Sequence, residues 1–175
     1  MAALVGAVVG GYFAKAGAVQ GAKTAADAIV RQVEEQRANE LNQWIRTERR
    51  VAYGEVVRAH GELASRLAAL RVAADRDAFE DLMGERVDEA WTVLSLACSG
   101  THLFGPESVF QAADQVRDAT RSCVIEHRAF VAATRLDDAV QLLRARQDLE
   151  GSRDEMRSTF TEFSVRAREA LGMPT

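Results

Sequence analysis

Residues 52–70 read AYGEVVRAHGELASRLAAL, and apolar side chains recur through them at intervals of three and four. These residues are Ala52, Val56, Ala59, Leu63, Leu67 and Leu70. This spacing gathers the apolar side chains on one face of an α-helix, whereas a strand would repeat every second residue. The stretch therefore predicts an amphipathic helix.

The same spacing extends toward the N-terminus. The apolar positions there are Val19, Ala26, Ile29, Val30, Val33, Leu41, Trp44 and Ile45. No proline precedes Pro106, so nothing interrupts a helix in the way proline does. An unbroken helix over residues 20–72 would be roughly 80 Å long at 1.5 Å per residue. A helix of that length needs a partner that covers its apolar face.

Three further helices follow. A turn at residues 71–77, with Asp75 or Asp77 as its capping residue, leads into a second helix that is expected to end at Ser99 and Gly100. Gly105 and Pro106 then separate it from the third helix. The apolar face of this helix carries Phe79, Leu82, Met83, Val87, Ala90, Trp91, Leu94 and Cys98. The third helix carries Val109, Ala113, Val116, Thr120, Cys123, His127 and Phe130.

The end of the third helix has two candidate positions. Thr134 with Asp137 resembles a capping pair that would start a fourth helix near residue 134, while Gly151 and Ser152 would place the break near 151. The fourth helix carries Leu136, Val140, Leu143, Leu149, Met156, Phe160, Phe163, Ala167 and Leu171. Both positions stay open from the sequence.

Amphipathic helices joined by short turns predict an all-α fold. We expect an antiparallel up-down-up-down four-helix bundle whose long first helix is extended at its N-terminus. The expected organisation is a glycine-rich apolar helix at 1–22, an overhanging amphipathic helix at 23–40 and the bundle at 41–172. Trp44, Tyr53 and Trp91 are expected to anchor the packing.

The N-terminal segment carries no charge from residue 2 to 14, and Lys15 then interrupts it. Gly6, Gly10, Gly17 and Gly21 fall within about 60° of helix circumference, a small-residue spacing known as a glycine zipper that lets helices approach closely. Three interpretations compete: a membrane anchor, a secretory signal peptide, and packing against other copies or the bundle in water. With a membrane anchor, the basic residues that follow would keep the bundle in the cytoplasm.

Composition excludes several classes of partner and chemistry. The 22 basic and 26 acidic residues give a net charge of -4, which argues against nucleic-acid binding. Cys98 and Cys123 would lie roughly 20 Å apart in the bundle, too far for a disulfide, so we expect two free thiols in the core. The densest basic cluster, at residues 46–50, is expected to form ion pairs with nearby acids.

No catalytic, cofactor-binding or metal site is expected. A di-metal bundle needs inward-facing Glu-x-x-His pairs, and Val57, Ser99 and Val124 stand three residues before the three histidines. His127 lies on the inner face and is expected to be a hydrogen-bonded core residue. Neither a nucleophile elbow nor a phosphate-binding glycine loop is present in the sequence, and no small-molecule substrate is evident.

Three stretches carry a resemblance: WIRTERRVAY (residues 44–53), LFGPE (103–107) and the ending at 163–172. Together with the glycine-rich apolar start, they resemble a loose group of actinobacterial proteins in which a short hydrophobic N-terminus precedes a helical bundle. The resemblance implies this architecture over nearly the whole chain and carries no activity with it.

The apolar face that continues past the expected bundle predicts an interface. We expect a non-enzymatic helical scaffold or interaction protein that associates with the membrane and forms homo-oligomers or binds another helical protein. The alternative is a soluble cytoplasmic adaptor that binds a partner's helix, and a more remote one is an enzyme or ligand-binding bundle. The expected interface residues are Gly6, Gly10, Gly17, Gly21, Val19, Ala26, Ile29, Val30 and Val33.

Overall fold

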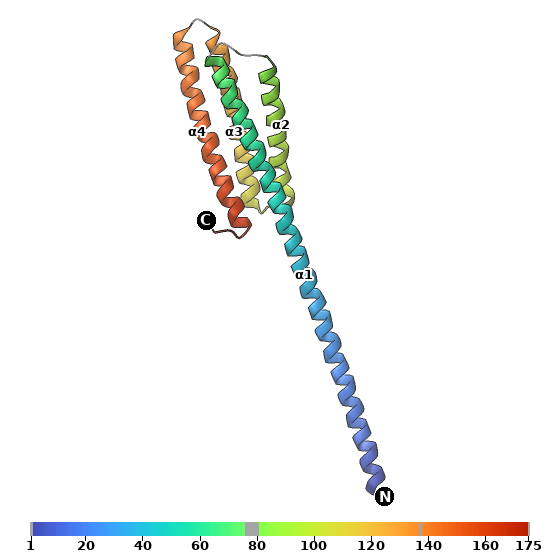
Figure 1. The fold of residues 1–175 in the computed structure, drawn as a ribbon. Helices are drawn as coiled ribbons and strands as arrows, with labels where there is room; N and C mark the ends of the chain where they lie inside the picture. The colour runs from blue at the N-terminus through green and yellow to red at the C-terminus, as the bar shows by residue number, and fades with distance from the viewer. Residues whose placement is uncertain (1, 76–80, 137, 175) are drawn as a thin grey trace. The chain divides into compact units, whose positions relative to one another are not determined.

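The computed structural model describes residues 2–75, 81–136 and 138–174, and it describes side-chain surroundings for 20–74, 84–136 and 138–174. These residues form four helices, α1 (Ala2–Asp75), α2 (Asp81–Phe104), α3 (Glu107–Thr134) and α4 (Ala139–Ala170). The described residues contain no strand. Figure 1 shows the chain reversing direction from each helix to the next. The prediction of an all-α, antiparallel four-helix bundle is confirmed.

The chain divides into two compact units, residues 1–45 and 46–175. The first unit consists of the N-terminal part of α1 alone. The second unit is the bundle, in which the remainder of α1 packs with α2, α3 and α4 (Figure 1). The structure thus begins the bundle at Arg46, within five residues or so of the boundary expected at 41.

One line of residues on α1 forms its share of the bundle core. We call it the core line, and its members are Tyr53, Val56, His60, Leu63, Leu67, Leu70 and Ala74. They alternate at intervals of three and four, and each is at most 8% exposed. Because the intervals average 3.5 residues, the line follows one side of the helix, as in coiled-coil packing. The amphipathic helix predicted from residues 52–70 is confirmed.

The three aromatic anchors differ in their surroundings. Tyr53 is buried at 3% exposure and meets the ring of Phe163 edge-on, with 6.2 Å between ring centroids. Trp91 packs against the core and is partly buried. Trp44 is 52% exposed, so its prediction as a packing anchor is wrong. It lies two residues out of the register that the core line repeats, so its side chain does not share that line.

Small side chains accompany the close packing of α3 and α4. Among the described residues, α3 packs more extensively against α4 than against α2. Ala145, Ser152 and Ala167 are buried on α4, and alanines recur along the buried face of α3. Short side chains let helix backbones approach, and the larger Phe130 and Phe163 are buried on the same two helices.

The turn between α2 and α3 is held by backbone geometry that requires glycine. The Gly105 N–H donates to the Thr101 carbonyl at 2.8 Å. A Cβ on Gly105 would lie 2.8 Å from that same oxygen and 3.3 Å from the Tyr53 hydroxyl. Arg49 on α1 adds a hydrogen bond from Nε to the Phe104 carbonyl at 2.7 Å. Arg49 of the basic cluster therefore binds a helix end, rather than the nearby acid that was expected.

The third helix ends at Thr134, which decides between the two positions left open by the sequence. Asp138 caps α4, and its carboxylate accepts hydrogen bonds from the N–H groups of Val140 and Gln141. Thr134 makes no cap, because its hydroxyl donates to the Val131 carbonyl. Gly151 lies inside α4. In the same way α2 continues through Ser99 and Gly100 to Phe104, so the end predicted at these two residues is wrong. A glycine inside a helix lowers its stability without ending it.

Several sequence predictions fall outside the described residues. These are the capping roles of Asp75 and Asp77, the position of Phe79, the side chains of Leu82 and Met83, and the role of Asp137.

Replacing Gly105 with alanine should destabilise the bundle, because the new methyl group would collide with the Thr101 carbonyl. We expect a loss of about 1–3 kcal/mol, the usual cost of overpacking. Gly151→Ala is the matched control, since a Cβ there meets nothing within 4 Å and alanine favours a helix by about 1 kcal/mol. Urea unfolding measures both. Equal stability of the two variants would contradict the role given to Gly105.

Candidate helix–helix interface

Residues 20–43 of α1 are all exposed. The large aliphatic residues among them are Ile29, Val30, Val33 and Leu41. Ile29 is 61% exposed, Val30 is 55% exposed and Val33 is 41% exposed. With Ala26, they occupy neighbouring positions on the helix, and we call these four residues the N-terminal patch. Covering one such aliphatic side chain is worth about 1.5–3 kcal/mol. The N-terminal patch is therefore a strong candidate for a contact with another molecule.

Little inside the first unit stabilises its helix apart from its own backbone hydrogen bonds. The described side-chain hydrogen bonds are local, such as Gln36 Nε2 to Glu40 Oε1 at 3.1 Å and Thr24 Oγ1 to the Gln20 carbonyl at 3.0 Å. A helix without tertiary packing is marginal in water, because most helical stability in proteins comes from a covered apolar face. A partner on the N-terminal patch would supply that missing stability.

Charges around the patch are mixed and nearly balanced. Residues 20–45 contain three basic side chains and four acidic ones, so the net charge is 3 − 4 = −1. The basic residues are Lys23, Arg31 and Arg37, and the acidic residues are Asp27, Glu34, Glu35 and Glu40. Such a surface attracts neither a polyanion nor a polycation strongly. It allows two like-charged copies to approach one another.

The glycine stripe is described only at its last member. Gly21 is exposed, and a Cβ there would meet nothing within 4 Å. Gly6, Gly10 and Gly17 belong to α1, but their surroundings, like those of Val19, lie outside the described side chains. The close helix approach predicted from these glycines stays a prediction. Among the residues that the structure describes, no helix is both long and apolar enough to cross a membrane.

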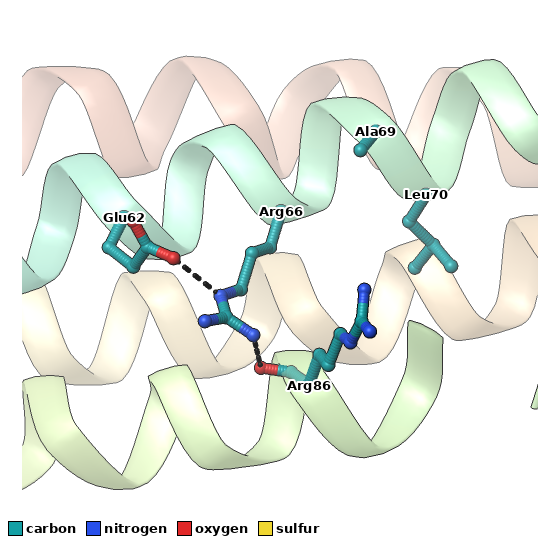
Figure 2. Close-up of a pocket in the computed structure, with 5 residues that line it drawn as sticks. All are labelled: Glu62, Arg66, Ala69, Leu70 and Arg86. Atoms are coloured by element: carbon teal, nitrogen blue, oxygen red, sulfur yellow. Dashed lines mark hydrogen bonds and ion pairs between the residues drawn. The ribbon is translucent and has the colours of Figure 1, made fainter. Parts of the chain in front are cut away.

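A second surface feature, not predicted from the sequence, is a groove between α1 and α2 of the bundle. Figure 2 shows its lining, Glu62, Arg66, Ala69, Leu70 and Arg86, around a space of about 320 Å³. Arg66 donates from Nε to Glu62 Oε1 at 2.8 Å and from Nη1 to the Arg86 carbonyl at 3.1 Å. The Arg66 guanidinium therefore ties the two helices together. Its partner on α2 is a backbone oxygen, so side-chain types could not reveal it.

The buried polar groups of the bundle are neutral. His60 stacks on Phe160 with 3.8 Å between ring centroids, and its Nε2 finds no hydrogen-bond partner among the described residues. His127 Nδ1 donates to the Cys123 carbonyl at 2.8 Å. Burial lowers the pKa of His60, and burial is also the largest cause that lowers the pKa of His127. Both rings are thus uncharged at neutral pH, and the prediction of a hydrogen-bonded core histidine at 127 is confirmed.

The two cysteines are free and buried, as predicted. Burial raises the pKa of Cys98 to about 12, and it also raises the pKa of Cys123. A thiol that stays protonated is a poor nucleophile and a poor metal ligand. The Sγ of Cys123 lies 3.6 Å from His127 Nδ1, but that nitrogen already serves the backbone carbonyl, so the two do not form a thiolate–imidazolium pair. No group of His, Cys, Asp and Glu among the described residues could hold a metal ion.

No family model, curated protein or solved structure matches the chain. The exposed N-terminal patch and the chemistry around it are therefore the basis for a functional proposal.

The two buried histidines should make the bundle lose stability below about pH 6.5. Their folded-state pKa values are lowered, so the unfolded chain takes up protons first as the pH falls, and the equilibrium shifts toward unfolding. Below about pH 6.5, each histidine lowers the free energy of unfolding by up to about 1.4 kcal/mol for each unit that the pH falls. Above that pH neither histidine changes it. Urea unfolding between pH 8.0 and 5.5 measures the slope. His60→Phe preserves the stacking on Phe160 and should reduce the slope, and an unchanged slope would refute the assignment for His60.

Proposed function

We propose that the protein is a non-enzymatic helical scaffold that associates with itself through the N-terminal part of α1. The observation that carries this proposal is the exposure of Ile29, Val30 and Val33 on one helix. The folded bundle would be the unit that is clustered, and the N-terminal helix would be the element that clusters it. The mechanism is the covering of apolar helix faces between copies, without chemistry.

A second copy of the same chain is favoured as the occupant of the N-terminal patch. The balanced charges of residues 20–45 create no strong field that would select an oppositely charged partner. The patch is also narrow, as expected for a helix that packs against another helix rather than against a broad surface. Binding of a different protein's helix would leave the purified chain monomeric, and so would be distinguished by its mass.

The two cysteines and the two buried histidines support a role without chemistry. The described thiols are buried and protonated, and the two buried imidazoles are neutral and lie in the core. A general acid or base must reach a substrate to act. None of these groups is placed in the described groove between α1 and α2, whose lining consists of Glu62, Arg66, Ala69, Leu70 and Arg86.

We further propose that residues 2–22 attach the scaffold to the cytoplasmic face of a membrane. The support is the absence of charge from residue 2 to 14 and the basic residues Lys15, Lys23 and Arg31 that follow. An apolar helix followed by cations suits the interface between lipid tails and anionic headgroups.

The double variant Ile29→Asp, Val33→Asp should not self-associate, because association would then bury two unpaired carboxylates on each copy. We expect the mass in solution to fall to that of the 19.1 kDa monomer, with the melting temperature of the bundle unchanged. Sedimentation measures the mass. Leu96→Asp with Leu103→Asp is the matched control, since both leucines are exposed on α2 at 69% and 78%. Equal masses for the two double variants would remove the assignment to the N-terminal patch.

Deleting residues 1–22 should move the protein from the membrane fraction to the supernatant of broken cells, because the apolar segment is lost. Separation of the fractions by ultracentrifugation and immunoblotting checks this, with the Ile29→Asp, Val33→Asp chain as the control that keeps its N-terminus. Membrane recovery independent of residues 1–22 would exclude the proposed attachment.

A further inference from the structure

The bundle part of α1 carries a second line of small and apolar residues besides its core line. We call it the outer line, and its members are Gly54, Val57, Gly61, Ala64 and Ala68. They alternate at intervals of three and four, as coiled-coil contacts do. Ala64 is half-buried and the other four are exposed, with Val57 at 47%. A Cβ on Gly54 or Gly61 would meet nothing within 4 Å, so the described chain leaves space there.

The outer line and the N-terminal patch share one seven-residue register. Ala26, Ile29 and Val33 alternate at intervals of three and four, and Gly54 follows Val33 after 54 − 33 = 21 residues, which is three heptads. Ala26, Ile29 and Val33 of the N-terminal patch therefore occupy the same pair of heptad positions as the outer line. The core line occupies a different pair, because each outer-line residue directly follows a core residue. Ala26, Ile29 and Val33 thus repeat the pattern of the outer line and not that of the core line, and Val30 lies beside them.

An antiparallel alignment of two copies brings these lines together with complementary sizes. In antiparallel coiled coils, the two alternating positions of one helix face each other's counterparts, so the residue numbers of facing pairs have a constant sum. In one such alignment the numbers of facing residues add up to 90. Ile29 of one copy then faces Gly61 of the other, and Val33 faces Val57. The largest side chain of the patch then meets the open space at a glycine. Ala26 faces Ala64 in the same alignment.

The same alignment also pairs opposite charges between the N-terminal patch and the outer line. Glu40 of one copy faces Arg50 of the other, so opposite charges meet twice in the symmetric pair. A shift by one heptad in either direction removes this match. If the numbers of facing residues add up to 83, Val33 faces Arg50. If they add up to 97, Glu40 faces Val57. Size and charge therefore select one register.

A parallel arrangement loses both kinds of complementarity. Every residue then faces its own counterpart, so Glu40 would meet Glu40 and Arg50 would meet Arg50 of the other copy. Like charges that face each other at an interface are unfavourable. Gly61 would also face glycine, and the aliphatic side chains of the patch would leave its open space unfilled.

We propose that two copies of the chain pair in antiparallel orientation along α1, with the N-terminal patch of each copy covering the outer line of the other. This inference rests on the proposed self-association. It specifies the surface that each N-terminal patch contacts and the relative orientation of the two α1 helices. Each copy would then contribute one patch and one outer line to a closed, two-fold symmetric contact. The exposed apolar residues of both lines would be covered at once.

Cysteine cross-linking of the full-length chain tests the direction of the pair. Glu40→Cys with Arg50→Cys in one chain should give a covalent dimer under mild oxidation, because each introduced thiol faces its counterpart in the other copy. Glu40→Cys alone should not cross-link, and the native chain, whose cysteines are buried, is the background control. Non-reducing electrophoresis reads the result. Cross-linking of the single Glu40→Cys variant would show a parallel pair and overturn the proposal.

Charge reversal provides a second test that requires no oxidation. Glu40→Arg or Arg50→Glu alone should weaken dimerisation by about tenfold or more, because like charges then face each other. The chain with both reversals should dimerise within about threefold of the native chain, since opposite charges meet again. Sedimentation equilibrium measures the dissociation constants. In a parallel pair the double variant would gain nothing over the single ones, and this result would contradict the antiparallel register.

The outcomes separate this inference from the proposed function. A monomeric full-length chain would overturn both. A dimer that depends on Ile29 and Val33 but shows neither the double-cysteine cross-link nor rescue by double charge reversal would retain the self-association and overturn the antiparallel pairing alone.

Discussion

The burial of the core line on α1 is the constraint on which the rest of the bundle depends. Val56 and Leu63 are fully buried, and Leu67 is 2% exposed. These side chains stay dry only if several helices surround them, because a single neighbour covers one side of a helix face. The chain meets this requirement with α2, α3 and α4, which contribute Leu94, Val116 and Phe163 to the same cluster. The antiparallel order follows, since short turns can join only neighbouring helix ends.

The core line and the outer line of α1 differ in composition. The core line is mostly leucine, valine and tyrosine, which fill space within one chain, whereas the outer line is mostly glycine and alanine. Glycines inside a helix cost about 1 kcal/mol each relative to alanine, so Gly54 and Gly61 weaken α1 without any contact in the described chain that requires them. A surface that receives a larger side chain from another molecule offers a physical reason for this cost.

Much of the fold could be predicted because helical periodicity and turn chemistry are local. The buried residues of α3 include all seven that its spacing predicted, and the turn at Gly105 and Pro106 lies where glycine and proline indicate it. The end of α3 could not be decided, because a glycine such as Gly151 is tolerated inside an exposed helix and Asp138 resembles any other acid until its geometry is known. The prediction for Trp44 was wrong because it relied on the usual burial of a large aromatic side chain. The heptad position of Trp44 places it off the core line.

The candidate interface could be predicted only in part. Exposure of Ile29, Val30 and Val33 followed from the length of the apolar pattern, and the structure agrees at these positions. The spacing of Gly54 and Gly61 places both on one side of the helix, but glycine and alanine add little to an apolar pattern, so the sequence does not predict the rest of the outer line. The open space around the two glycines is known only from the structure. The bridge from Arg66 to the Arg86 carbonyl was equally hidden, since any residue type offers a carbonyl.

The contacts between α1 and α4 have a consequence for how the chain folds. Tyr53 meets Phe163 and His60 stacks on Phe160, so these partners are separated by about a hundred residues in sequence. The α2–α3 and α3–α4 pairs are hairpins whose loops close quickly and at low entropic cost. The contact of α1 with α4 closes the longest loop of the bundle, so its entropic cost is highest before the other helices have packed. We expect the aromatic contacts between α1 and α4 to form after the pairs of consecutive helices.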